Sequence, residues 1–131
     1  MIKSIQQFQS EGVKKLENIF VDYSTDMKKI AEMVQGVTKS VVDLGLSMIA
    51  EEWESYDEML RRNKHIRRGW QIVKRDQTSL VTSLGEVTYH KTLFYHPKEK
   101  TYAYLLDKVM QLDPHTRLTE DAVAQMLNEA V

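Results

Sequence analysis

The sequence contains no cysteine, and this absence excludes a disulfide framework, a thiolate zinc site and a cysteine nucleophile. Proline and glycine are also scarce, at two and five of 131 residues, so the chain is not collagen-like. With 42% hydrophobic residues it is not a disordered tail either, and its length fits one domain. Lys and Arg together number 18 against 19 Asp and Glu, so the net charge of −1 by itself indicates neither a nucleic-acid nor a membrane partner.

Long hydrophobic runs are missing as well. The longest candidate, residues 37–50, has 14 positions and includes Lys39 and Asp43, whereas a membrane span needs about 18 uncharged residues. The first twelve residues, MIKSIQQFQSEG, have no apolar core of signal-peptide length. We therefore expect no membrane partner and a cytoplasmic location.

The first half has a regular pattern of apolar residues. Eleven positions alternate strictly at spacings of three and four, which averages the 3.5-residue period of a left-handed coiled coil. We call these positions the seam: Val13, Leu16, Phe20, Tyr23, Met27, Ile30, Val34, Val37, Val41, Leu44 and Met48.

The seam belongs to a helical self-association region over residues 1–66, as one helix or two. Ser24 or Thr25 could be the N-cap of a second helix with Asp26 in its first turn, so we favour helices over about 3–21 and 25–63, possibly fused. The seam can be covered by an intramolecular hairpin, by packing against the sheet or by a second copy. Because so small a domain has little else to cover it, we expect a homo-oligomer.

The charges change sign abruptly after the seam. Residues 51–58 contain five acids and no base, and residues 61–75 contain seven bases and no acid. The pairs Asp57–Arg61 and Glu58–Arg62 have favourable i,i+4 spacing, so a solvated, internally paired surface is one interpretation. The other is a DNA-binding surface that contacts phosphates. Its candidate residues are Arg61, Arg62, Lys64, Arg67, Arg68, Lys74 and Arg75.

From Trp70 onward the hydrophobic period changes to two, which predicts strands. The segments WQIVKR, TSLVTSL, EVTYHKTLFYH and TYAYLLD indicate a small antiparallel sheet of three or four strands over residues 67–112. We place breaks at Asp76-Gln77 and at Gly85-Glu86, and a hairpin turn at residues 96–100, where Pro97 cannot join a ladder.

Residues 113–131 are predicted to begin a further helical segment. Asp113-Pro114 interrupts the chain, and Thr119 is the expected N-cap of a helix with acids in its first turn. The last residues stop inside a helical pattern without a cap, so this segment is expected to be truncated. The fold class is therefore α+β: a long N-terminal helix or helical hairpin, a small antiparallel sheet and a C-terminal helix.

Known catalytic patterns are not found in the sequence. The histidines lack H-x-x-x-H and H-E-x-x-H spacing, and the glycines form neither a P-loop nor a G-x-G-x-x-G motif. We therefore expect no catalytic residue, no metal, no cofactor and no small-molecule substrate in this chain.

Four segments carry a family resemblance: VVDLGLSMIAEEWESYDEMLR, LVTSLGEVTYHKTLFYH, YLLDKVMQL and PHTRLTEDA. With them the chain resembles the ISLre-two family of bacterial insertion-sequence transposases, effectively over its whole length. The resemblance implies a longer protein, with a helical region and then an RNase-H-like domain whose carboxylates bind Mg²⁺. Nothing here matches that domain, so no catalytic residue is carried over and magnesium is expected only there.

The residues and the resemblance together lead to one functional expectation. The chain would be the N-terminal, non-catalytic module of a transposase-like protein, which contributes multimerisation and contact with transposon-end DNA. The alternatives are a pure oligomerisation or adaptor module, or an inactive truncated transposase remnant. In each case the chain itself is not expected to be an enzyme.

Overall fold

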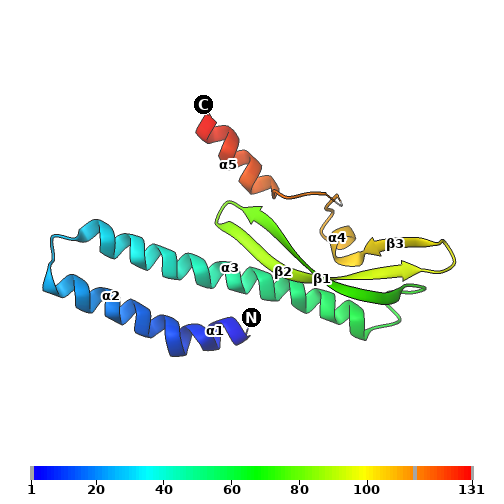
Figure 1. Ribbon diagram of the computed structural model, residues 1–131, viewed down its shortest axis with the longest axis horizontal. Coiled ribbons are helices and arrows are strands. Elements are labelled where there is room, and N and C mark those ends of the chain that lie inside the picture. The colour runs from blue at the N-terminus through cyan, green and yellow to red at the C-terminus, as the bar shows by residue number, and fades with distance from the viewer. Residues whose placement is uncertain (1, 114, 131) are drawn as a thin grey trace. The chain divides into compact units, whose positions relative to one another are not determined.

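The computed structural model describes residues 2–113 and 115–130 and has two compact units, Met1–Ile49 and Ala50–Val131. Helix α3 passes from the first unit into the second, and the strands all lie in the second (Figure 1). This confirms the predicted α+β class. The elements are α1 (Ile2–Gln7), the π-helix η1 (Phe8–Gly12), α2 (Val13–Thr25), α3 (Ile30–Arg62), β1 (Gln71–Thr82), β2 (Gly85–His96), β3 (Thr101–Tyr104), α4 (Leu105–Val109) and α5 (Glu120–Ala130).

The first unit is a helical hairpin, in which α2 runs beside the first part of α3 in the opposite direction (Figure 1). The two helices approach closely at Gly36, where an added Cβ would lie 3.1 Å from Cδ1 of Ile19. Gly36 therefore allows α2 and α3 to approach each other closely. A larger side chain at this position would require Ile19 to move. The seam is thus divided between two helices.

The break between the helices comes later than the sequence indicated. Ser24 and Thr25 lie in the last turn of α2, where their hydroxyls donate to the carbonyl oxygens of Val21 and Asp22, each at 2.6 Å. Their predicted role as N-cap of the second helix is therefore wrong. Instead, Asp26 leaves the helical conformation and its carboxylate accepts a hydrogen bond from the Lys28 N–H at 3.3 Å.

The sheet in the second unit has the order β1-β2-β3, with antiparallel neighbours. The predicted break at Asp76-Gln77 is wrong, because both residues pair with β2 inside a single twelve-residue β1. Polar residues are tolerated there because β1 is an edge strand with one side toward solvent. A register shift between Ile72 and Lys74 marks a bulge instead.

One turn of the sheet agrees with the prediction, one differs, and the last strand is shorter than expected. Residues 97–100 form the predicted turn between β2 and β3. The β1–β2 turn is at residues 83–84, two positions before the predicted site, and Gly85 follows it with a φ of 142°. The expected fourth strand stops at Tyr104, because Leu105 begins α4 and packs with Leu60 and Phe94.

The C-terminal helix α5 begins at Glu120, directly after Thr119, as predicted. The Thr119 hydroxyl donates a hydrogen bond to the Val81 carbonyl oxygen at 3.3 Å. Asp121, an acid in the first turn of α5, accepts a hydrogen bond from the Ser83 N–H at 2.8 Å. This bond joins α5 to the β1–β2 turn. Pro114 of the predicted interruption and the last residue of the chain lie outside the described residues.

The hydrophobic core lies wholly in the second unit. Leu60 of α3, Phe94 of β2 and Leu105 of α4 form its centre, with Met59 and Trp70 packed against them. The remaining buried apolar side chains are also in that unit: Leu80, Val87, Tyr89, Leu106 and Ala122. Among described residues 3–49, Ser4 is the one buried side chain.

Candidate functional site

Two acids of α3 bind the free edge of β2. Strand β3 pairs with β2 only over residues 93–96, so the earlier residues of β2 have no strand on that side. The Glu54 carboxylate accepts the His90 N–H at 2.9 Å, and the Asp57 carboxylate accepts the Thr92 N–H at 2.9 Å. The acids are three residues apart and share one side of the helix. They satisfy backbone donors that would otherwise be left without a partner.

Asp57 is the most enclosed of these acids, with a relative exposure of 2%. Its second oxygen accepts the Thr92 hydroxyl at 2.6 Å, and that hydroxyl accepts a bond from Arg61 at 3.1 Å. The predicted direct Asp57–Arg61 pair is therefore replaced by a relay through Thr92. The other predicted pair, Glu58–Arg62, is present at 2.9 Å. Part of the acidic run is thus buried and structural, which the interpretation as a solvated surface missed.

The candidate DNA-binding residue Arg67 stabilises the turn after α3. Its guanidinium donates to the carbonyl oxygens of Trp70 at 2.7 Å and Arg61 at 3.3 Å. It also lies 5.9 Å from the centre of the Phe94 ring. These contacts occupy Arg67 within the fold.

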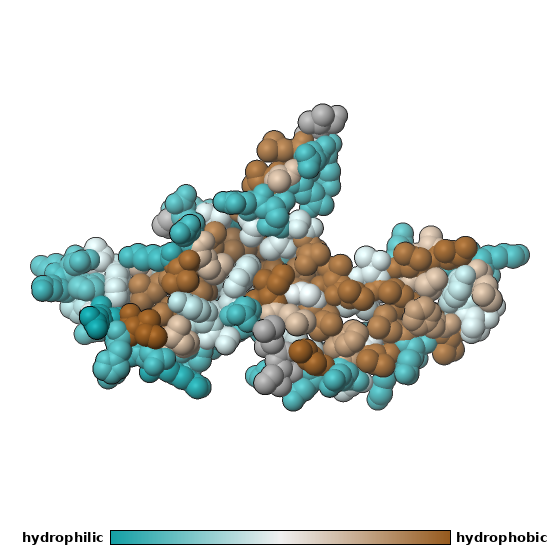
Figure 2. Space-filling view, turned by 180° about the vertical axis from the view of Figure 1, so that it is seen from behind, coloured by the Kyte–Doolittle hydropathy of each residue, from teal (hydrophilic) through white to brown (hydrophobic). Residues whose placement is uncertain are grey.

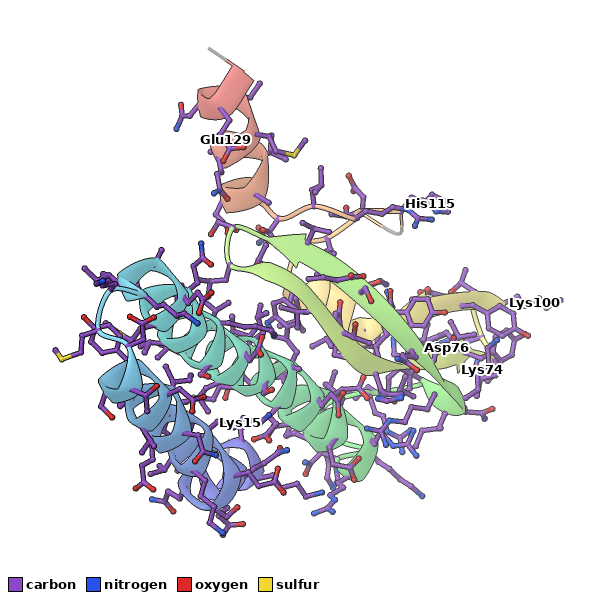
Figure 3. All side chains as sticks on the ribbon, turned by 60° about the vertical axis from the view of Figure 1, so that its left-hand side comes forward. Lys15, Lys74, Asp76, Lys100, His115 and Glu129 are labelled. Carbon is purple, nitrogen blue, oxygen red and sulfur yellow. The ribbon has the colours of Figure 1, made fainter. Side chains whose placement is uncertain are left out.

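The other candidate bases keep more contact with solvent. Lys74 pairs with Asp76 and Arg75 with Glu54, both at 3.5 Å, and all of these pairs are partly exposed. Such pairs contribute about 0–1 kcal/mol, so a phosphate can replace the carboxylate at small cost. Figure 3 shows Lys74 and Asp76 close together on β1.

Lys64 and Arg68 lie in the exposed turn between α3 and β1, and within the described part of the chain they form no ion pair. The basic turn, as we call residues 62–68, therefore has its most accessible charges at Arg62, Lys64 and Arg68.

A second polar cluster was not found from the sequence. The Lys91 ammonium contacts the Asp107 carboxylate at 2.7 Å with both side chains nearly buried, and it lies 4.2 Å from the centre of the Tyr104 ring. The Tyr104 hydroxyl in turn donates to Asp76 at 2.6 Å. The only signal in the sequence is the position of Lys91 in an otherwise apolar alternation with Tyr89 and Leu93.

The tyrosines of this cluster are held in the neutral form. The hydrogen bond to Asp76 raises the pKa of Tyr104 to about 12, and the same bond lowers the pKa of Asp76. Burial, with a smaller effect from Asp107, raises the pKa of Tyr89 to about 12. The Tyr104 hydroxyl therefore stays protonated near neutral pH and donates its hydrogen bond to Asp76. The cluster ties β1, β2 and α4 together.

The seam contributes an exposed apolar surface to the helical hairpin. The half-buried seam residues are Leu16, Tyr23, Val37, Leu44 and Met48. The other six, which we call the hairpin face, are exposed: Val13, Phe20, Met27, Ile30, Val34 and Val41.

The exposed seam residues of both helices lie on one side of the hairpin. At about 100° per residue, Val13 and Phe20 lie about a quarter-turn beyond the side of α2 that faces α3. Val34 and Val41 are displaced from the inner side of α3 in the same rotational sense. Because the helices run in opposite directions, these equal rotations bring both sets to a common side. Figure 2 shows hydrophobic surface along the hairpin.

The inside of the hairpin is itself partly polar. A groove near its open end is lined by Gln7, Glu11 and Lys15 from one side and by Ser40 and Asp43 of α3 from the other. The labelled Lys15 can be followed on α2 in Figure 3. Phe8 and Leu44 also line this groove, so the inside of the hairpin is mixed in polarity.

The described residues include no group of three or more His, Asp or Glu side chains placed to hold a metal ion. None of the described helices combines the length and the apolarity that a bilayer crossing requires.

These features define a class: an α+β protein with a core-poor helical hairpin and a well-packed three-stranded unit. The chain belongs to the uncharacterised protein family UPF0236, which it matches over residues 23–131. One UPF0236 protein of Caldanaerobacter subterraneus subsp. tengcongensis is 23% identical over 90% of this chain, and another is 24% identical over 86%. The chain spans about a quarter of the length of these relatives, 25% and 24%. No solved structure matches the chain.

Proposed function

We propose that this chain is the N-terminal, non-catalytic module of a transposase-like protein, and that its hairpin face joins copies of that protein. The resemblance to ISLre-two transposases supports the first part. The second part is carried by one observation, the exposed apolar side chains of α2 and α3 on a common side of the hairpin. Since coiled-coil seams bind other helices, the partner we favour is the same face of a second copy.

The energetics of this face are consistent with a dimer. Burying a half-exposed Val, Ile or Phe contributes on the order of 1 kcal/mol. Two copies bring twice six such side chains to a shared interface. The gross gain of about 12 kcal/mol must offset the loss of translational and rotational freedom, which costs about 4–15 kcal/mol. At the lower end of this cost the balance of about 8 kcal/mol corresponds to a micromolar dissociation constant, and at the upper end no dimer forms.

Sedimentation equilibrium tests the self-association. Val34 and Val41 are 50% and 53% exposed, so Val34→Asp or Val41→Asp leaves the inside of each hairpin intact. Either change places a charge in the proposed interface, and we expect each variant to sediment as a monomer where the unchanged chain forms a dimer. Gln35→Asp is the matched control, because Gln35 is exposed on another side of α3 and should leave the dimer unchanged. A monomeric unchanged chain at tens of micromolar contradicts the proposal.

DNA contact is the second part of the proposed role, and the basic turn supports it. Lys64 and Arg68 are exposed, and neighbouring Arg62 keeps most of its surface in contact with solvent. Phosphate contacts release counterions, so affinity for terminal-repeat DNA should fall steeply with salt. These contacts position the protein without reading sequence.

A salt titration of duplex binding tests this contact. The double variant Lys64→Ala/Arg68→Ala should weaken binding alike on all sequences and reduce the log–log salt slope by about 2, or 0.9 per lost contact. Lys14→Ala/Lys15→Ala removes the same charge from α2 and is the control. If the unchanged chain binds no duplex even at low salt, an oligomerisation or adaptor module, or an inactive remnant, is the better description.

A further inference from the structure

The β2–β3 hairpin presents two tyrosines on an open part of the sheet. Tyr95 and Tyr102 are direct partners in the ladder, and their ring centroids are 4.6 Å apart with a 37° angle between the rings. Tyr102 is 63% exposed, although aromatic side chains of this unit such as Tyr89 are buried. On the other side of Tyr95 its partner is Gln71 of β1. Three strands thus contribute one row: tyrosine, tyrosine and glutamine.

The next row of the same sheet face adds a lysine. Leu93 pairs with Tyr104 on one side and with Lys74 on the other, and it lies two residues from Tyr95, on the same face. The adjacent residue Phe94 points to the opposite face and packs into the core. At these two rows this face of the sheet is partly open to solvent: Gln71, Lys74 and Tyr102 are exposed, and Leu93, Tyr95 and Tyr104 are half-buried.

Lysine side chains lie on two sides of this part of the sheet. The turn at residues 97–100 carries Lys98 and Lys100 against the single acid Glu99, and Tyr95 and Tyr102 lie one residue inside each end of the hairpin. Figure 3 shows Lys100 at this turn and Lys74 on β1. The acid nearest Lys74 is Asp76, which already accepts the Tyr104 hydroxyl. The tyrosine pair is thus flanked by lysines on two sides.

We propose that this tyrosine platform, formed by Gln71, Lys74, Tyr95 and Tyr102 with Lys98 and Lys100, binds unpaired bases of single-stranded DNA. Exposed aromatic rings on a sheet stack on bases without strong sequence preference, and nearby lysines attract the phosphates. Stacked bases inside a duplex offer no free ring surface to such a platform. This inference rests on the DNA contact proposed above and deepens it, because it names the form of DNA and residues outside the basic turn.

Fluorescence anisotropy with labelled oligonucleotides tests the platform on the intact chain. The probes are a thymidine oligonucleotide of about twelve residues, a duplex of equal length, and a uridine oligonucleotide. The unchanged chain should bind the thymidine strand more tightly than the duplex and at least as tightly as the uridine strand. Tyr102→Ala should weaken binding to the thymidine strand roughly 5- to 100-fold, while Tyr102→Phe keeps the ring and most of the affinity.

The controls separate this proposal from its alternatives. Tyr56→Ala removes an exposed tyrosine from α3 and should bind like the unchanged chain. Equal affinity of Tyr102→Ala and the unchanged chain for the thymidine strand overturns the proposal. So does tighter binding of duplex, or of the uridine strand, by the unchanged chain. A Tyr102→Ala variant that alters sedimentation but not DNA affinity would assign the face to a second copy of the chain instead.

The two DNA proposals can fail separately. Lys64→Ala/Arg68→Ala should impair duplex binding far more than binding of the thymidine strand, and Tyr102→Ala should do the reverse. If neither DNA form is bound, both proposals are wrong. If only the tyrosine-dependent binding is observed, the proposal for the tyrosine platform is supported and the proposal for the basic turn is wrong.

Discussion

The hairpin unit (Met1–Ile49) and the sheet unit (Ala50–Val131) differ in how much apolar surface each of them buries. The second unit buries eight apolar side chains, whereas among described residues 3–49 no apolar side chain is fully buried. The hairpin nevertheless has as regular a hydrophobic pattern as any part of the chain. A regular pattern therefore shows that a surface is apolar, and the structure decides whether the chain itself covers it.

The two units also differ in how their charged side chains are buried. In the sheet unit Asp57, Lys91 and Asp107 are buried with partners within hydrogen-bond distance. In the hairpin the corresponding ion pair, Lys39 with Asp43, is largely exposed at 2.8 Å. We expect charge removal to be costly in the sheet unit and almost neutral in the hairpin unit.

The same substitution in each unit gives the largest expected contrast. Phe94 is 0% exposed and Phe20 is 50% exposed. Phe94→Ala should lower the free energy of unfolding by about 3–5 kcal/mol, because it leaves a cavity in the core. Phe20→Ala should change it by less than about 1 kcal/mol in the monomer.

Urea unfolding measures this contrast when two signals are followed: tryptophan fluorescence reports the sheet unit, where Trp53 and Trp70 lie, and circular dichroism also reports the helical hairpin. Similar costs for the two variants would remove the distinction between the units.

Removal of a buried acid gives the next largest effect. Asp57→Ala leaves the buried Thr92 N–H and the Thr92 hydroxyl without their acceptor, so unfolding should become easier by about 2–3 kcal/mol. Asp43→Ala, the matched change in the hairpin, should cost at most about 0.5 kcal/mol. Denaturant midpoints at neutral pH provide the measurement, and a near-neutral Asp57→Ala would show that β2 does not depend on α3.

The smallest expected effect concerns acid. Hydrogen bonds from Ser83 and Thr119 lower the pKa of Asp121 well below its usual range. A carboxyl group whose folded pKa is lowered contributes stability above its unfolded pKa of about 4 and loses it as the pH falls through the folded value. The sheet unit should therefore lose stability below about pH 4. Asp121→Asn should show a shallower loss over that range, and an unchanged acid profile would contradict the role of Asp121.

The elements of the fold could be predicted because they depend on local patterns. The 3.5-residue spacing of the seam predicted helices in the first half, and the alternation after Trp70 predicted the sheet. The predicted boundaries are wrong where tertiary contacts determine them. Asp76-Gln77 has the composition of a turn but pairs with β2, and Leu105 begins a helix and packs in the core with Leu60 and Phe94.

The sites were harder to predict for the same reason. The charge run at 51–75 was visible, but only the structure separates Asp57 and Arg67, which act inside the fold, from exposed Lys64 and Arg68. The Tyr95–Tyr102 pair depends on strand register, which the sequence leaves open.

The central claim is that the hairpin is completed by a second copy, and amide hydrogen exchange at several protein concentrations tests it most directly. Exchange protection of residues 30–48 should increase as the protein is concentrated from below to above the dissociation constant, because association covers the hairpin face. Protection of β2 should stay constant over the same range. Equal, concentration-independent protection of both segments would contradict the claim, since the hairpin would then be stable alone.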